Sequence, residues 1–227
     1  MKVLRAGRAT DRPQDNDCVR VTFHGWTREG VLFASSPSED DKGMVQCMQE
    51  VVSGLAEALK AMSVGEARRV WVPAELAFAA VDHDRVRPKV DLTFDIALLD
   101  LMKAPPVPKD LKAPPRTVKR AASGLALQIL KKGKGSEHPS EASSVTLHFA
   151  GWTADGTLVE TTLMSNPPAS YEMGEVIPGW HEALLRMVVG DKVRVWIPAA
   201  LAFGEKPRRR GVPAGDLVYE LELLAIE

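Results

Sequence analysis

Few side chains in this chain are of the types that carry out nucleophilic or metal chemistry, and those few are scattered. Two cysteines are present, Cys18 and Cys47, and they lack the Cys-rich spacing of a zinc site. We expect both to be reduced, partly buried thiols. Five histidines lie far apart in different expected elements: His24, His83, His138, His148 and His181. The sequence therefore predicts no metal site and no cofactor.

The basic run Lys206-Pro207-Arg208-Arg209-Arg210 is the densest cluster of charge in the chain. Such a run can hold an acidic partner or a phosphate, whereas at a loop tip it is more often a solvated face. The formal net charge of the whole chain is only −1, with a sequence pI near 6.5. This balance opposes a general nucleic-acid binder, which usually presents a strongly basic face.

A tryptophan and a carboxylate are the other candidates. Trp180 begins an apolar series at helical spacing that continues through Ala183, Leu184, Met187 and Val188. Gly190 follows, and we expect it to end this helix as its C′ residue. A tryptophan on such a face is ordinarily core, and Glu160 beside a strand end is ordinarily solvated.

The elements that position these residues are short strands around that helix. Residues 145–149, 193–197 and 217–223 alternate apolar and polar side chains, as strands with one buried face do. Asp155-Gly156 and Asn166-Pro167-Pro168 mark turns between elements. The pattern predicts a small α+β domain in which an antiparallel sheet packs on one short helix.

This domain occurs twice, because the chain aligns with itself. Phe23-His24-Gly25-Trp26 falls on Phe149-Ala150-Gly151-Trp152, and Trp71-Val72-Pro73 falls on Trp196-Ile197-Pro198. Each copy has about a hundred residues, a typical size for one domain. We expect two tandem domains with cores that need no disulfide or metal.

A proline-rich segment separates the copies. We assign residues 1–102 to the first domain, 103–122 to the linker and 123–227 to the second domain. Prolines exclude helix and central strand, so the linker is expected to be an extended polyproline-II spacer. The alternative is that this segment is itself an SH3-type ligand.

Two further features bear on location. Residues 1–8 have no apolar core of a signal peptide, and no stretch of the chain approaches the apolar length of a membrane span. We expect a soluble cytoplasmic protein with no membrane or nucleic-acid partner.

The second copy resembles the FKBP-type peptidyl-prolyl isomerase family, also called immunophilins. The residues that carry the resemblance read HFAGWTADGTLVETT, then GEVIPGWHEALLRMVVGDKVRVWIPAALAFG, then GVPAGDLVYELELL. The first copy matches the same pattern more loosely. The resemblance implies an antiparallel sheet wrapped on a short helix, with an apolar pocket between them that receives a proline ring.

Carried over position by position, the resemblance places the pocket floor at Trp180. The positions it marks as catalytic are Trp180, Glu160, Phe149, Ile177, Phe203 and Tyr219. Those it marks as substrate-binding are Val159, Val176, Tyr171 and Val212. The backbone amide of Ile177 stands where the family binds its ligand's carbonyl. The implied partners are proline-containing polypeptides and unfolded proteins.

Some pocket positions differ from the family's usual residues. Phe149 replaces a tyrosine, which removes one hydroxyl donor, and Val159 and Ala169 replace phenylalanines. Glu160 stands for an aspartate and Phe203 for another tyrosine. We expect a wider pocket, isomerase activity that is moderate or low, and weak binding of the family's macrolide inhibitors.

Comparison of the two copies separates the residues that both keep, which the fold needs and which we call the frame, from the pocket residues that differ. The glycines of the frame recur, but Leu55 stands for Trp180, Ala34 for Glu160 and Gln46 for Tyr171. We therefore expect the second domain to be a peptidyl-prolyl isomerase and the first to be a degenerate copy. The alternative is a non-catalytic chaperone or peptide-binding module with degenerate pockets.

Overall fold

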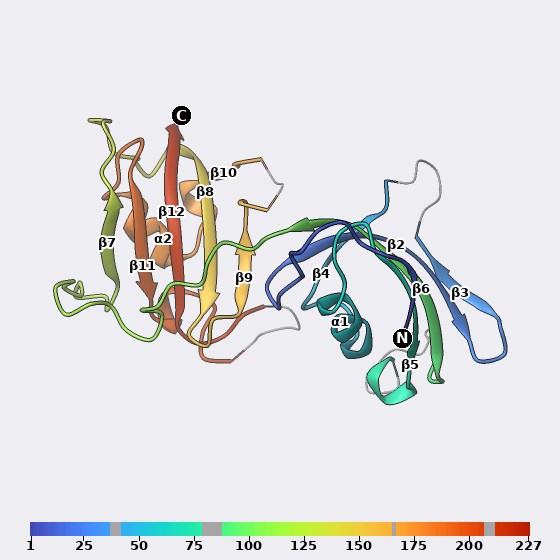
Figure 1. The fold of residues 1–227 in the computed structure, drawn as a ribbon. Coiled ribbons are helices and arrows are strands. Elements are labelled where there is room, and N and C mark those ends of the chain that lie inside the picture. The colour runs from blue at the N-terminus through green and yellow to red at the C-terminus, as the bar shows by residue number, and fades with distance from the viewer. Residues whose placement is uncertain (37–41, 79–87, 165–166, 207–211) are drawn as a thin grey trace. The chain divides into compact units, whose positions relative to one another are not determined.

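The computed structural model describes residues 1–36, 42–78, 88–164, 167–206 and 212–227. The chain divides into two compact units, Met1–Ala104 and Pro105–Glu227. We call them the first and second domain. Each contains an antiparallel sheet and, within the described residues, one α-helix, which confirms the predicted α+β class (Figure 1).

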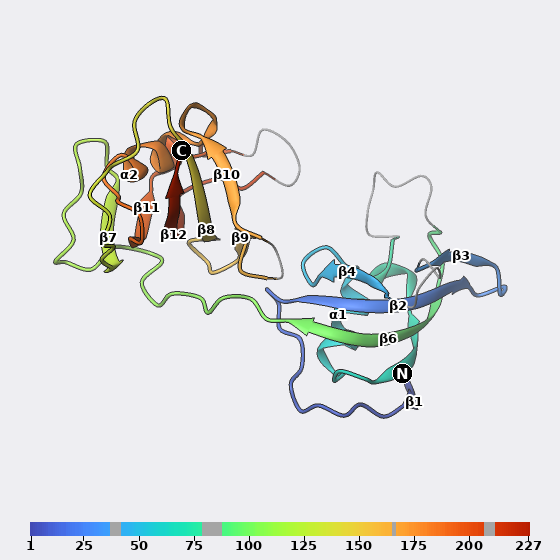
Figure 2. The same cartoon turned by 90° about the horizontal axis from the view of Figure 1, so that it is seen from above.

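The sheet of the first domain has the strand order β1-β5-β6-β2-β3, and β4 pairs with β2. Figures 1 and 2 show this sheet curved, with helix α1 along one of its faces. The elements are β1 (Lys2–Arg5), β2 (Cys18–Thr27), β3 (Leu32–Ser35), β4 (Met44–Cys47), α1 (Ser53–Lys60), β5 (Ala67–Val72), a 3₁₀ turn (Ala74–Leu76) and β6 (Leu92–Met102).

The second domain repeats this plan with the order β10-β8-β12-β11-β7, and β9 pairs with β8. Its elements are β7 (Ala126–Lys131), β8 (Ser144–Thr153), β9 (Leu158–Thr161), β10 (Ala169–Glu172), α2 (Pro178–Leu184), β11 (Lys192–Ile197) and β12 (Leu217–Ile226). Two 3₁₀ turns, Met173–Glu175 and Ala199–Leu201, complete it.

Alternation along the strands builds each core. In β12 the residues Leu217, Tyr219, Leu221 and Leu223 are fully buried, whereas Glu220 and Glu222 are only partly buried. One face of the sheet therefore packs on the helix and joins the core. None of the helices among the described residues is long and apolar enough to cross a membrane.

The predicted helix is shorter than its apolar spacing indicated. Helix α2 ends at Leu184, and Met187, although fully buried, lies in the turn that follows. Gly190 has a positive φ of 90° and its amide donates to the carbonyl of Leu223 (2.8 Å). It forms the turn into β11, so the prediction that it ends the helix as its C′ residue is wrong.

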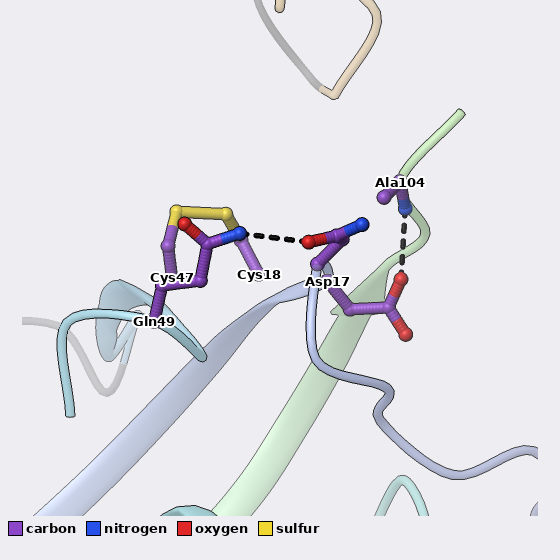
Figure 3. Close-up of a disulfide and its surroundings, with 6 residues drawn as sticks. Asp17, Cys18, Cys47, Gln49 and Ala104 are labelled. Carbon is purple, nitrogen blue, oxygen red and sulfur yellow. Dashed lines mark hydrogen bonds between the residues drawn. A yellow bond between two sulfur atoms is a disulfide. The ribbon is translucent and has the colours of Figure 1, made fainter. Parts of the chain in front are cut away.

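The two cysteines form a disulfide, so the prediction of reduced thiols is also wrong. The register pairs Cys18 on β2 directly with Cys47 on β4, which brings the two sulfur atoms together across adjacent strands. Figure 3 shows the bridge beside two hydrogen bonds, one from Gln49 to Asn16 and one from the Ala104 amide to Asp17. The bridge and the second bond tie the start of β2 to β4 and to the end of β6.

The segment predicted as a linker contains no helix and, through Lys119, no strand, as expected. Its residues from Pro105 onward are grouped with the second domain, however, and part of the segment packs there. Leu111 is buried, and Asp110 binds both Arg194 and Trp196. Residues around Asp110 are therefore held by the second domain and are not a free spacer.

Candidate functional site

Helix α2 and the sheet of the second domain enclose a cluster of four aromatic rings. Trp180 lies at its centre, 4.9 Å from Phe149, 5.1 Å from Tyr219 and 5.8 Å from Tyr171 between ring centroids. All three rings meet the indole edge to face, the geometry that aromatic quadrupoles favour. Four side chains from one helix and three strands thus form a rigid apolar surface.

The start of α2 explains how Trp180 reaches this position. Pro178 occupies the first turn, where its missing amide costs no hydrogen bond. Gly179 lies against Ile197, because a Cβ there would stand 2.3 Å from the Ile197 methyl Cγ2. The helix therefore approaches β11 closely and directs the following residue, Trp180, onto the sheet.

Trp180 is 4% exposed and belongs to the core of the second domain. Its Nε1 atom is buried without a hydrogen-bond partner among the described residues. A buried donor without a partner is rare and costs free energy, and Trp152 Nε1 is buried in the same way. Trp180 is therefore a core residue of the second domain, and its role in a binding site stays a prediction from the sequence.

Tyr219 and Glu160 are joined across a glycine. Register pairs Tyr219 with Gly151 and Gly151 with Glu160, so the three lie in one row across β12, β8 and β9. Gly151 has no side chain, and a Cβ there would stand 2.2 Å from the Tyr219 ring. The phenol therefore lies over β8, and its hydroxyl donates to Glu160 Oε1 at 2.8 Å.

Burial, and next the nearby Glu160 carboxylate, raise the pKa of Tyr219. The same two causes raise the pKa of Tyr171. The Tyr219 phenol therefore stays protonated and acts as a donor at neutral pH. Its bond orients an otherwise exposed carboxylate at the rim of the aromatic cluster.

The sequence comparison expected one hydroxyl donor fewer, because Phe149 stands where the family has a tyrosine. In the structure Tyr219, on the neighbouring strand β12, supplies a hydroxyl donor. The sequence contains a signal for this arrangement, since both members change together in the first copy, to Phe94 and Ala34. Without the strand register, nothing in the sequence indicated that these positions touch.

The remaining predicted positions surround the cluster. Val159, Val176, Ile177 and Phe203 are partly buried and pack against the hydrophobic core of the second domain. Val212 is half-buried but is not among the residues that pack on that core. The structure therefore brings together all of the predicted site residues except Val212.

Ile177 contributes a backbone donor. It is the N-cap residue of α2, and its carbonyl accepts from the His181 amide at 3.0 Å. Its own amide donates to no acceptor among the described residues. Because amides in the first turn of a helix have no partner within the helix, this N–H is available to a bound carbonyl.

Other polar candidates lie elsewhere. His148 contacts the Thr162 hydroxyl and His181 pairs with Glu141. The described residues contain no group of His, Cys, Asp or Glu side chains that could hold a metal ion. Residues 207–210 of the basic run, and His83, lie outside the described residues.

The first domain has an apolar cavity at the equivalent place, with a volume of about 440 Å³. Its lining includes Leu55 where the second domain has Trp180, and Phe94 and Ala34 where it has Tyr219 and Glu160. The smaller leucine leaves room, but the hydroxyl and the carboxylate are both missing. The first copy thus keeps an apolar hollow without the polar pair.

Two segments of the chain, residues 9–99 and 135–224, match the family model described as FKBP-type peptidyl-prolyl cis-trans isomerase. The chain is 30% identical over 209 residues to the FKBP-type 22 kDa peptidyl-prolyl cis-trans isomerase of Escherichia coli strain K12, a match that covers 90% of this chain and 96% of that protein. It is 39% identical over 111 residues to the isomerase FkpA of Aeromonas hydrophila, covering 48% of this chain.

The chain is also 36% identical over 108 residues to the outer membrane protein MIP of Legionella longbeachae, a match that covers 46% of this chain. The matches span only 41% of the Aeromonas protein and 45% of the Legionella protein. Among solved structures, the three FKBP domains of wheat FKBP73 align with 100% of this chain and 93% of that chain, at 25% identity and a TM-score of 0.43.

Proposed function

Because the chain belongs to the FKBP-type peptidyl-prolyl cis-trans isomerase family, we propose that its second domain accelerates the cis–trans isomerisation of X-Pro bonds in polypeptides. The observation that carries this proposal is the cluster of Trp180, Phe149, Tyr171 and Tyr219 beside Glu160. A proline ring fits against such a surface, and a peptide carbonyl can accept from the free amide of Ile177.

The reaction requires no bond to be made or broken. Its barrier of roughly 18–20 kcal/mol is the loss of amide resonance when the peptide bond twists. The planar amide is more polar than the twisted one, so an apolar enclosure disfavours the ground state more than the transition state. The aromatic cluster provides that enclosure, and no nucleophile is needed.

The two polar groups of the proposed site, the Ile177 amide and the Glu160 carboxylate, have different roles. The Ile177 amide holds a substrate carbonyl and fixes the direction in which the chain enters. The Glu160 carboxylate, oriented by Tyr219, lies at the rim, where it meets the amide that rotates. We assign Trp180 the floor under the proline ring and the side chains of Val159, Val176 and Phe203 the walls.

Trp180→Leu tests the proposal, because it introduces the residue of the first copy. We expect kcat/KM on a short prolyl peptide, measured in a protease-free assay, to fall by at least about tenfold, a loss of roughly 1.4 kcal/mol of transition-state stabilisation. Ile129→Ala, on the exposed part of β7 in the same domain, is the matched control and should leave the rate unchanged. Wild-type activity in a folded Trp180→Leu variant would contradict the proposal.

A second function belongs to the first domain. We propose that its cavity of about 440 Å³ holds apolar segments of unfolded chains without isomerising them, since it lacks counterparts of Trp180 and Glu160. Weak binding of macrolide inhibitors by the second domain is also proposed, because Val159 and Ala169 leave its walls less aromatic than is usual in the family.

A further inference from the structure

The outer face of the first sheet carries a row of four residues on neighbouring strands. Register pairs Leu32 with Trp26, Trp26 with Thr93, and Thr93 with Trp71. Directly paired residues have their side chains on the same face of a sheet. The neighbours of Thr93 along β6, Leu92 and Phe94, point into the core. The row, which we call the outer row, therefore faces away from the cavity.

The second domain has the same row with the same register: Leu158, Trp152, Val218 and Trp196. The two rows differ in what covers them. Trp71 is 54% exposed and Leu32 is 52% exposed, whereas Trp196 is 4% exposed and Leu158 is 8% exposed. Apolar side chains at identical positions of one fold are thus open in the first copy and buried in the second.

In the second domain the proline-rich segment contributes this cover. Trp196 Nε1 donates to the carbonyl of Asp110 at 2.8 Å, and Arg194 Nη1 donates to the Asp110 carboxylate at 2.5 Å. A Cβ on Gly156, in the turn after β8, would stand 3.2 Å from a Val107 methyl and 3.9 Å from a Leu111 methyl. Residues 107–111 therefore run between β11 and the turn that joins β8 to β9.

The first domain keeps the arginine and the tryptophan that hold this segment, as Arg69 and Trp71, but within the described residues their equivalent donor atoms have no acceptor. Arg69 uses Nε and Nη2 to bind Asp95, as Arg194 uses the same atoms to bind Glu220. Nη1 of Arg69, whose equivalent binds Asp110, donates to no acceptor in the described part of the chain. The indole N–H of Trp71 likewise donates to no acceptor there.

Among the residues that the structure describes, no segment covers Gly30 beside this row. A Cβ on Gly30, the counterpart of Gly156, would meet no atom within 4 Å. A hollow of about 360 Å³ lies beside Trp71, lined by Arg28, Asp91 and Thr93 among others. The row has two exposed apolar ends, Leu32 and Trp71, with Trp26 and Thr93 partly buried between them. Exposed apolar side chains beside donors that have no acceptor within the described residues are typical of an interaction surface.

We propose that the outer row of the first domain binds an extended segment of a partner protein that has the chemistry of residues 107–111. Such a segment has an apolar residue, then an aspartate for Arg69 with a carbonyl for the Trp71 indole, and then a leucine for the apolar row. Flanking prolines keep it extended and so reduce the entropy lost on binding.

A partner protein fits this surface better than a second copy of the chain. In every copy, residues 107–111 already lie on their own second domain, where covalent attachment gives a high effective concentration. Binding in trans by another copy would break one set of these contacts to form an equivalent set. The outer row also lies on the face of the first sheet opposite the cavity of the first domain. A polypeptide client bound in that cavity therefore does not compete with the partner for the outer row.

A labelled peptide with the sequence of residues 104–113, titrated with the full chain and followed by fluorescence anisotropy, tests the proposal. We expect saturable binding that Trp71→Ala weakens by at least about tenfold, as loss of a buried aromatic anchor does. Val45→Ala, at an exposed position on β4 of the same domain, is the control and should leave binding unchanged. A peptide with Asn in place of Asp110 should bind more weakly and with less dependence on salt.

The proposal is overturned if the peptide does not bind, or if Trp71→Ala binds it as well as the wild type does. Sedimentation tests whether a second copy of the chain, rather than another protein, binds to the outer row. We expect wild type and Trp71→Ala to have the same mass, whereas self-association that Trp71→Ala abolishes would identify a second copy as the partner. Circular dichroism of Trp71→Ala confirms that the variant is folded.

Discussion

The phenol of Tyr219 reaches Glu160 because Gly151 between them has no side chain. The first copy has Gly25 at that position and loses both partners, to Phe94 and Ala34. A pair that is kept together in one copy and absent from the other behaves as a unit. At the scale of the residue, the proposed site therefore depends on this pair as much as on Trp180.

A double-mutant cycle tests this coupling. Tyr219→Phe and Glu160→Ala should each lower kcat/KM. The double variant should have the same kcat/KM as the less active single variant, because either change alone breaks the hydrogen bond between the two side chains. We expect a coupling energy of about 1 kcal/mol, the net value of a typical hydrogen bond. Strictly additive effects on kcat/KM would show that the two residues act independently.

The conservative change Glu160→Asp serves as the control for the carboxylate. If the charge only orders the rim, this variant should keep or raise activity while Glu160→Ala lowers it. Equal rates for wild type, Glu160→Asp and Glu160→Ala would remove Glu160 from the site and return it to the solvated surface.

At the scale of the element, the disulfide joins β2 and β4 in the first domain and closes a loop with a sequence separation of 29 residues. The second domain contains no cysteine. The counterpart of β4, strand β10, is held to β8 by backbone pairing, by the Thr146–Ser170 and Ser144–Glu172 side-chain hydrogen bonds and by the Phe149–Tyr171 ring contact. Only the first domain is therefore sensitive to reduction.

Reduction should lower the free energy of unfolding of the first domain by about 3–4 kcal/mol, the effect expected from opening a loop of this length. Denaturant unfolding with and without reductant measures it, and the unfolding of the second domain should not change. Because disulfides persist in oxidising compartments, alkylation of thiols in intact cells also tests the predicted cytoplasmic location. Two free thiols would support that location, and a bridged pair would contradict it.

At the scale of the whole molecule, the proposed function assigns catalysis to the second domain and binding of unfolded chains to the first. A fragment from Pro105 to Glu227 keeps the contacts of Asp110 and Leu111 with the second domain, which a fragment beginning near Ala122 would lose. The longer fragment is therefore the one to isolate. It should match the full chain in kcat/KM on a short prolyl peptide.

On a refolding reaction limited by proline isomerisation, the full chain should be faster than this fragment. A second binding surface raises the local concentration of an unfolded client by holding it near the active domain. Refolding rates at equal molar concentrations make the comparison, and the fragment Met1–Ala104 should show no peptide activity. Strong activity in that fragment would contradict its assignment as a degenerate copy.

Much of this architecture was predictable from the chain. The duplication, the alternating strands and the helix bearing Trp180 follow from patterns that span few residues, because strand and helix periods are local properties. The resemblance to a family then placed Phe149, Glu160, Trp180 and Tyr219 near one another, and the structure brings these four together.

Only the tertiary structure decided which residues distant in the sequence contact one another. Cys18 and Cys47 meet only through the register of β2 and β4, and Tyr219 meets Glu160 only across Gly151. The proline-rich segment has the composition of a free spacer, yet Asp110 binds Arg194. Register and docking depend on the sum of many long-range contacts, so local patterns in the sequence do not contain them.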